Sequence, residues 1–167
     1  MRNIWPEAAE QRCWNHKILN VLDQLPRTQH RAARPMLRAV AYAPSRKEAE
    51  RQRKEFEAWC HRRGYHQAAE TLGRDWDRMV TFYQFPREHW VHLRTVNVVE
   101  SPFAALRLRT DAAKRFKRSD RATAVIWKML MVAERRFRRL NAPHLLAKVY
   151  AGVRYVDGVE ASQEVAA

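Results

Sequence analysis

The sequence predicts a mainly α-helical protein with at most one or two short strands. Apolar side chains recur at the helical period over most of the chain, and only four of the 167 residues are glycine. Prolines and glycines stand at the ends of most periodic stretches, where they stop helices. Residues 152–158 have the pattern of a strand or a hairpin edge. No stretch has the composition of a linker, so residues 1–158 are expected to form a single unit, followed by a disordered tail over 159–167.

Two helices are expected in the first quarter of the chain. Apolar residues from 14 to 25 follow the helical period, and Pro26 ends that run. A second helix is expected over about residues 28–42. Pro35 lies inside this span and is expected to kink the helix or to divide it in two.

Two further helices are expected before residue 84. Ser45 and Glu48 have the spacing of a capping box, and Gly64 follows the helix that they begin as a C-cap residue. The next helix is expected over residues 65–83. Gly73 weakens it locally, by about 1 kcal/mol relative to alanine.

The stretch from residue 93 to residue 110 is expected to begin as a turn and to become a helix. Asn97 has the position of an N-cap and Glu100 that of the third helical residue, which is again a capping-box spacing. Pro102 is compatible with the first turn, whose amides have no helical acceptor. Spacing alone therefore favours a structural capping role for Glu100.

The last third of the chain is strongly basic and then helical again. A long helix is expected from about residue 119 to residue 140, with Ser119 or Asp120 as its N-cap. A short helix is expected to start at Pro143.

Charge is the strongest functional signal. The chain has 32 Lys and Arg against 18 Asp and Glu, a formal net charge of +14. Such an excess indicates an anionic partner, most often nucleic acid, with an anionic membrane surface or the ribosome as alternatives. No apolar run of about 18 residues predicts a membrane helix, and neither a signal peptide nor a disulfide framework is recognisable. A cytoplasmic protein is expected.

Two basic segments are the best candidates for DNA binding. They are centred on residues 107–121 and 135–139, and a solvated helix face is the alternative interpretation of both. The candidate phosphate contacts in the first segment are Arg107, Arg109, Lys114, Arg115, Lys117, Arg118 and Arg121.

Helical spacing places Glu100, Ala104, Arg107 and Asp111 on one face. A carboxylate followed by an arginine along the same face suits a metal-bound phosphate, because the carboxylate holds the cation and the arginine holds the anion. A two-metal phosphodiester site needs several carboxylates, however, and Glu100 alone does not supply them.

Cys13 and His16 have a C-x-x-H spacing. They could supply half of a structural zinc site, but zinc needs four ligands, and Cys60 with His61 is the only other adjacent pair. Local packing or hydrogen bonding is therefore the favoured role of Cys13 and His16.

Four motifs occur in a fixed order along the chain. Together they resemble the C-terminal part of a mutator-type bacterial insertion-sequence transposase, over about residues 6–158. The motifs are Gln11-Arg12-Cys13-Trp14-Asn15-His16-Lys17, Phe85-Pro86-Arg87-Glu88-His89-Trp90, Leu93-Arg94-Thr95-Val96-Asn97-Val98-Val99-Glu100-Ser101 and Arg136-Phe137-Arg138-Arg139-Leu140-Asn141.

The resemblance implies a ribonuclease-H-like catalytic core with an Asp, Asp, Glu triad and a helical domain inserted before the final Glu. Residues 13–92 would be the helical insertion region and residues 93–158 the C-terminal part of the core. Glu100 matches the catalytic Glu, which would bind a metal ion, normally Mg²⁺, in metal-dependent DNA cleavage and strand transfer. Cys13 and His16 match a family signature at the junction of core and insertion, with a structural role.

In the family, both catalytic aspartates lie upstream of this signature. The chain is therefore expected to be a truncated transposase that is inactive alone and binds Mg²⁺ weakly. Ile126, Trp127 and Leu130 would lack part of the sheet on which they pack, which favours self-association. The expected partners are DNA at the element ends and a full-length transposase or a second copy, in the cytoplasm on the nucleoid. The alternative is a basic helical module that binds DNA or a transposase without catalysis.

Overall fold

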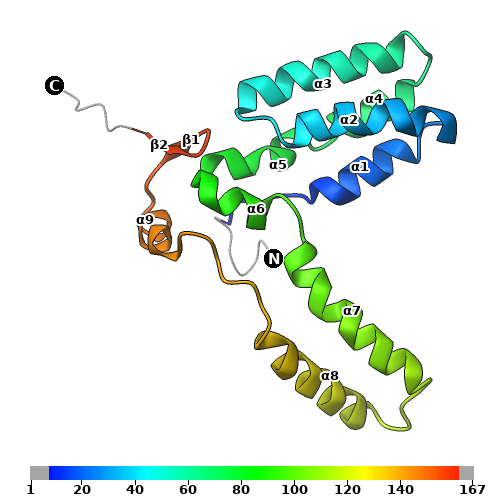
Figure 1. The fold of residues 1–167 in the computed structure, drawn as a ribbon, viewed down its shortest axis with the longest axis vertical. Helices are drawn as coiled ribbons and strands as arrows, with labels where there is room; N and C mark the ends of the chain where they lie inside the picture. Colours follow the sequence, from blue (N-terminus) through cyan, green and yellow to red (C-terminus); the bar gives the residue numbers. More distant parts are fainter. Residues whose placement is uncertain (1–7, 162–167) are drawn as a thin grey trace. The chain divides into compact units, whose positions relative to one another are not determined.

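The computed structural model describes residues 8–161 and confirms the prediction of a mainly α-helical chain. Two compact units are distinguished by their internal contacts (Figure 1). Unit 1 is drawn from Met1–Thr95 and Asn141–Ala167, and unit 2 is Val96–Leu140. The sequence has no linker at either boundary, so this division was not expected. The assignment of residues 13–92 to an insertion region and 93–158 to a catalytic core concerns descent and stays a prediction.

Unit 1 begins with a bundle of four helices. Helix α2 packs on α3, α3 on α4, and α1 on both α4 and α2 (Figure 1). The elements are α1 (Trp14–Leu22), η1 (Arg27–Gln29), α2 (His30–Ala41), α3 (Arg46–His61) and α4 (His66–Gly73). The side chains in their shared core include Trp14, Val21, Leu37, Val40, Phe56, Cys60 and Leu72. Burial of these apolar faces is the main force that holds the bundle together.

The predicted helix signals in this bundle are largely confirmed. Ser45 Oγ accepts a hydrogen bond from Glu48 N at 3.2 Å at the start of α3, and Gly64 adopts a φ of +77° just after it. Pro35 lies inside α2 without dividing it, and its ring is on the exposed side. The first helix ends at Leu22, one turn before the expected end.

The prediction of a single helix over residues 65–83 is wrong. The structure has α4, then α5 (Trp76–Met79) and η2 (Thr81–Gln84), because Asp75 adopts a left-handed conformation with φ +58°. Asp75 forms ion pairs with Arg12 and Arg78, which hold it at this break. The apolar residues of the predicted helix are still buried, because each short piece keeps its apolar side toward the core.

The remainder of unit 1 consists of short elements. Chain segments far apart in the sequence meet here, because the C-terminal hairpin packs next to the residues that follow η2. The elements are η3 (Arg87–His89), α6 (Trp90–Leu93), η4 (Pro143–Leu145), α9 (Leu146–Tyr150), β1 (Tyr155–Val156) and β2 (Val159–Glu160). The strands pair antiparallel, with Tyr155 opposite Glu160. The tail predicted from residue 159 is therefore corrected, since 159 and 160 belong to β2. Residues 162–167 lie outside the described residues.

Unit 2 is a hairpin of two helices, α7 (Asn97–Ala112) and α8 (Ser119–Glu134), which pack on each other. Among the unit 2 residues whose side chains the structure describes, Pro102 and Leu106 are the buried ones. The helix expected to reach residue 140 ends at Glu134. Two helices of 16 residues each thus share very little core of their own.

The starts of both hairpin helices differ from expectation. Val96, not Asn97, is the N-cap of α7, and Arg118 rather than Ser119 or Asp120 is that of α8. Pro102 therefore lies inside α7, beyond the first turn, where it removes one helical hydrogen bond. Within residues 8–161, no helix is both long and apolar enough to cross a membrane.

Candidate nucleic-acid interface

Glu100 lies in the first turn of α7 with an exposed side chain. Its backbone N–H donates to the carbonyl of Val96 at 3.0 Å, so the helix is already formed at this residue. A carboxylate in the first turn interacts favourably with the positive end of the helix dipole. This position suits both interpretations of Glu100, a structural cap and a metal-binding carboxylate.

The predicted face of α7 is formed as expected. Glu100, Ala104, Arg107 and Asp111 all belong to this helix, and all four are exposed. Glu100 and Arg107 are seven residues apart, which is a rise of about 10.5 Å along the helix axis. The two side chains are therefore about two helical turns apart along the face.

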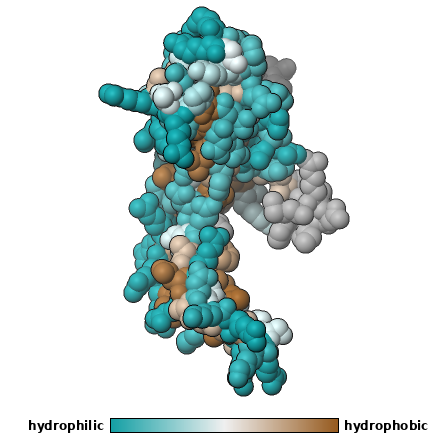
Figure 2. All heavy atoms as spheres, turned by 90° about the vertical axis from the view of Figure 1, so that its right-hand side faces the viewer, coloured by the Kyte–Doolittle hydropathy of each residue, from teal (hydrophilic) through white to brown (hydrophobic). Residues whose placement is uncertain are grey.

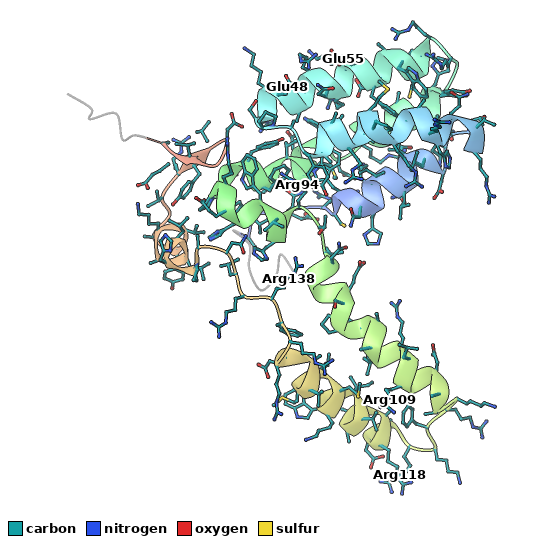
Figure 3. All side chains as sticks on the ribbon, viewed as in Figure 1. Glu48, Glu55, Arg94, Arg109, Arg118 and Arg138 are labelled. Atoms are coloured by element: carbon teal, nitrogen blue, oxygen red, sulfur yellow. The ribbon has the colours of Figure 1, made fainter. Side chains whose placement is uncertain are left out.

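The seven cations of the first basic segment cover one end of the hairpin. Arg107 and Arg109 come from α7, Arg121 comes from the first turn of α8, and the other four lie in the connection between the helices. All seven are exposed, and Figure 3 shows Arg109 and Arg118 at this end. We call these seven residues the hairpin cations: Arg107, Arg109, Lys114, Arg115, Lys117, Arg118 and Arg121.

An acidic partner compensates part of this charge. The guanidinium of Arg118 lies 3.0 Å from the carboxylate of Asp120, and this is the one ion pair that the described structure gives the hairpin cations. The second basic segment, residues 135–139, follows the end of α8 and is not helical. The expectation that this segment lies on the long helix is therefore wrong. Its side chains are exposed.

The described residues do not complete a metal centre. No three His, Cys, Asp or Glu side chains gather at one point within the part of the chain that the structure describes. Glu100 is thus a single carboxylate on an exposed helix, and a magnesium ion that bridges two phosphate oxygens needs more ligands than it offers.

The Cys13 and His16 pair lies at the start of α1. Cys13 is the N-cap residue of this helix and is buried, whereas His16 is exposed. Cys60 is also a buried thiol, in α3, and burial raises its pKa to about 11. Both cysteines therefore occupy packed positions in the helical bundle.

The residues around Cys13 join distant parts of unit 1. The side-chain amide of Gln11 makes two hydrogen bonds to distant backbone atoms. Its Nε2 donates to the carbonyl of Met79 at 3.1 Å, and its Oε1 accepts from Phe82 N at 2.9 Å. Trp14 Nε1 also donates to Met79 O, at 2.8 Å. Lys17 is buried, and its ammonium donates to the carbonyls of Thr71 and Arg74 at 2.8 and 2.6 Å.

These hydrogen bonds give the first motif a structural role. Lys17 satisfies carbonyls at the C-terminus of α4, where the helix dipole favours a cation. Burial lowers the pKa of its ammonium, and the nearby charge of Arg12 acts in the same direction. Sequence reasoning selected Cys13 and His16 in this motif, whereas Gln11, Trp14 and Lys17 make hydrogen bonds to distant backbone carbonyls.

The second motif holds the C-terminal segment. Arg87 N donates to the carbonyl of Gly158 at 3.1 Å, and Gly158 N donates to Tyr83 O at 3.2 Å. Buried His89 lies with Nε2 3.2 Å from the carbonyl of Ala142, and His92 Nε2 accepts a hydrogen bond from Asn141 N at 3.0 Å. Both histidines thus fix the segment that follows unit 2.

Arg94 in the third motif is surrounded by aromatic rings. Its guanidinium carbon lies 4.5 Å from the ring centre of Tyr42 and 4.9 Å from that of Phe82, and Figure 3 shows its position in unit 1. Burial lowers its pKa. No carboxylate among the described residues pairs with it, so the ring faces stabilise the charge. In the sequence, the aromatic residues that cluster over positions 82–90 are the signal that could have indicated this environment of Arg94.

Comparison with protein families gives a direct match to a transposase model. Residues 1–139 match the model described as Transposase, Mutator family. The chain belongs to the Mutator family of transposases. The predicted family resemblance is thereby confirmed.

Two curated transposases show the extent of the similarity. The chain is 36% identical over 158 residues to the transposase for insertion sequence element IST2 of Acidithiobacillus ferrooxidans, which covers 95% of this chain and 53% of that protein. It is 39% identical over 158 residues to the transposase for insertion sequence element IS6120 of Mycolicibacterium smegmatis, with 95% and 49% covered. The chain therefore spans about half the length of these Mutator-family relatives. No solved structure matches it.

Proposed function

We propose that this Mutator-family chain binds DNA through the hairpin cations and contributes Glu100 as one acidic residue of a DNA strand-transfer site. The observation that carries this proposal is the arrangement of α7. Its first turn presents an exposed carboxylate, and its other end presents exposed cations. Metal-dependent cleavage and strand transfer of element-end DNA is the reaction of which Glu100 would form part.

Electrostatics favours DNA as the ligand of the hairpin cations. The chain carries a net charge of +14, and the seven hairpin cations have one acidic partner among the described residues. Each cation that neutralises a phosphate releases condensed counterions, which makes DNA binding favourable at low salt and weaker at high salt. Arginine adds a planar set of donors that matches phosphate oxygens.

By itself, the chain is proposed to be unable to cleave DNA. Two-metal phosphoryl transfer needs several carboxylates around the ions, and Glu100 is a single exposed one. For the same reason Mg²⁺ is expected to bind Glu100 only weakly. The other acidic ligands would have to come from residues outside the described part or from another polypeptide.

A nicking assay tests the catalytic half of this proposal. Purified full-length chain is incubated with Mg²⁺ and DNA that carries the ends of its element, beside the Glu100→Gln variant. Both proteins are expected to give the same background. Metal-dependent nicking that the Glu100→Gln substitution abolishes would show that the chain is active alone, and would overturn the proposed inactivity.

A salt titration tests the DNA-binding half. Lys114, Arg115 and Lys117 are replaced together by glutamine, and binding to a short duplex is followed by fluorescence anisotropy. Loss of three phosphate contacts is expected to reduce the slope of log affinity against log salt by about 2.7. A wild-type chain whose DNA affinity does not change with salt would contradict the electrostatic model.

The alternative function is that of a module that binds a transposase without catalysis. It is favoured by the exposed apolar surface of unit 2, where Trp127 is 66% and Leu108 76% exposed. Figure 2 shows apolar side chains at the surface over this part of the chain. Contiguous apolar surface that is exposed often marks an interaction site, so a second polypeptide that packs on these side chains is a reasonable partner.

Co-purification with a full-length transposase of the same element separates the two functions. Capture that the double substitution Leu108→Glu and Trp127→Glu abolishes, without a change in DNA affinity, favours the interaction module. Retained capture by this variant excludes the exposed apolar face as the contact. Light scattering of the chain alone reports whether the same two side chains drive self-association.

A further inference from the structure

A second basic surface lies in unit 1, where α1 and α2 border a cleft. Its volume is about 750 Å³. The side chains that line it come from α1, from α2 and from the residue that follows α2: Asn15, Ile18, Leu19, Arg31, Arg34, Pro35, Arg38 and Tyr42. Three of these eight residues are arginines, and none is acidic. We call this feature the arginine cleft.

The three arginines form a row along α2. Arg31, Arg34 and Arg38 follow the i, i+3, i+7 spacing that places side chains on one helix face, and all three are exposed. Seven residues correspond to a rise of about 10.5 Å along the helix. This length is enough for the row to contact more than one phosphate of a DNA strand.

The arginines of the neighbouring helix α3 differ from those of the cleft. The arginines of α3 are paired with carboxylates of the same helix: Arg46 with Glu50 at 3.0 Å, Arg53 with Glu57 at 3.2 Å, and Arg51 with Glu48 and Glu55. Among the described residues, no acidic side chain forms an ion pair with an arginine of the cleft. Three positive charges therefore share a concave surface without internal compensation.

The walls of the cleft suit a sugar–phosphate backbone. Leu19 and Tyr42 are each about half exposed and provide apolar surface next to the cations. Arg38 lies over the Tyr42 ring at 5.8 Å, and Arg94 lies over the same ring at 4.5 Å, which adds positive charge beside the cleft. A concave surface lined by one sign of charge concentrates the electric field and attracts a polyanion.

We propose that the arginine cleft binds the phosphate backbone of DNA, as a contact separate from the hairpin cations. This inference rests on the proposed function in one respect, since it takes DNA as the ligand of the chain. It adds that the helical bundle of unit 1 contributes to DNA binding, and that Arg31, Arg34 and Arg38 each contact a phosphate.

A charge-matched pair of variants tests the cleft. In one, Arg31, Arg34 and Arg38 are replaced by glutamine; in the other, the exposed cations Lys47, Lys54 and Arg62 of α3 and its C-cap are replaced by glutamine. Both variants lose three charges. Duplex binding of the full chain is measured by anisotropy between about 50 and 200 mM salt, after circular dichroism has established that both variants keep the wild-type helix content.

The cleft variant is expected to lose about 2.7 from the slope of log affinity against log salt, whereas the control keeps the wild-type slope. Over the fourfold salt range, the affinity of the cleft variant then falls about 40-fold less than that of the wild type. Equal effects of both variants would show that net charge alone matters, and would overturn the proposal. A wild-type slope in the cleft variant would also overturn it.

Two further outcomes separate this inference from the proposed function. If the triple substitution of Lys114, Arg115 and Lys117 weakens DNA binding and the cleft variant does not, the hairpin contact stands and the cleft proposal fails. If the wild-type chain binds no DNA at all, both fail. Binding of both variants to vesicles that contain phosphatidylserine is measured as well. Loss of vesicle binding in the cleft variant, with DNA binding unchanged, would identify a membrane surface as the ligand and overturn the proposal.

Discussion

The indole Nε1 of Trp14 donates a hydrogen bond to the backbone carbonyl of Met79, 2.8 Å away and 65 residues further along the chain. Trp14 is only 1% exposed, and its ring packs edge-on against Trp76 with 6.0 Å between the ring centres. This contact attaches the first helix of unit 1 to the segment in which the predicted long helix is broken. The family motif around Cys13 thus stabilises the fold at a point that local sequence does not specify.

Substitution of Trp14 by phenylalanine removes this hydrogen bond and part of the buried ring. The free energy of unfolding is expected to fall by about 1–3 kcal/mol, because a buried donor is lost and a small cavity remains. Urea denaturation followed by far-UV circular dichroism measures the change. Trp127→Phe is the control, since Trp127 is 66% exposed, and it is expected to change stability by less than about 0.5 kcal/mol.

Gly158 is expected to tolerate alanine less well than Gly152. Both residues have positive φ, +82° and +77°, so alanine strains the backbone at each by about 1–2 kcal/mol. A Cβ at position 158 would lie 2.8 Å from Arg87 Cβ and from Trp90 Cζ2, whereas one at position 152 meets no atom within 4 Å. Gly158→Ala should therefore lower the midpoint of thermal unfolding more than Gly152→Ala. Equal midpoints would contradict the close packing of the hairpin on Trp90.

The stability that Glu48 contributes is expected to depend on pH. Hydrogen bonds from the Arg51 guanidinium, and then from Gln52, lower the pKa of its carboxyl from 4.5 to about 2. Because the folded pKa lies below the unfolded one, this contribution is present above about pH 4.5 and disappears as the pH falls through about 2. The difference in unfolding free energy between wild type and Glu48→Gln should shrink over that window.

A non-titrating change at the same helix start provides the control. Ser45→Ala removes the hydroxyl that accepts from Glu48 N, and it is expected to cost about 0.5–2 kcal/mol. Because a serine hydroxyl does not titrate between pH 2 and pH 4.5, this loss should be constant across the range. A Glu48→Gln difference that is equally constant would argue against the Arg51 interaction as its source.

The thiol of Cys60 is expected to react slowly in the folded protein. Burial is the main cause that raises its pKa to about 11, and the charge of Glu57 acts in the same direction. In a Cys13→Ala background, modification by a disulfide reagent at pH 8 should be slow, should become faster as the pH approaches 11, and should be rapid in denaturant. Fast modification of the native protein at pH 8 would show that this side of α3 opens readily.

Part of the fold could be predicted from local sequence. The periodic apolar residues of α1, α2 and α3 determine which face of each helix is buried, and Ser45 and Gly64 mark the ends of α3 through capping and left-handed geometry. These signals involve residues within a few positions of one another. They therefore need no distant partner to be recognised in the sequence, and the structure agrees with them.

The wrong prediction over residues 65–83 has a physical origin in distant contacts. Asp75 interrupts the helix predicted over 65–83, because ion pairs with Arg12 and Arg78 and the hydrogen bonds of Lys17 favour a break there. Arg12 and Lys17 lie more than fifty residues from this break, so local spacing gives no sign of these two partners. The early end of α8 at Glu134 has no local breaker in the sequence, and we have no physical account of it.

The candidate site was predicted only in part. The sequence places Glu100 and Arg107 on one helix face, and α7 has that arrangement. The catalytic role of Glu100 follows from family resemblance and remains a proposal, because a carboxylate at a helix start looks the same whether it caps the helix or binds a metal. The arginine cleft was not predicted, since its walls come from two helices that meet only in the folded chain.

By itself, the sequence determined that this chain is helical, strongly basic and a member of the Mutator family, because composition, period and ordered motifs are properties of the chain. The tertiary structure decided that the arginines of α2 border a cleft with α1 and that no acidic side chain of another described element pairs with them. On α3 the arginines find glutamates one turn away, whereas on α2 they border a cleft without one. The sequence also indicated Cys13 and His16 as the notable pair of the first motif. Only packing revealed that Gln11, Trp14 and Lys17 hold unit 1 together. Each of these three side chains forms a hydrogen bond to a backbone atom more than fifty residues away.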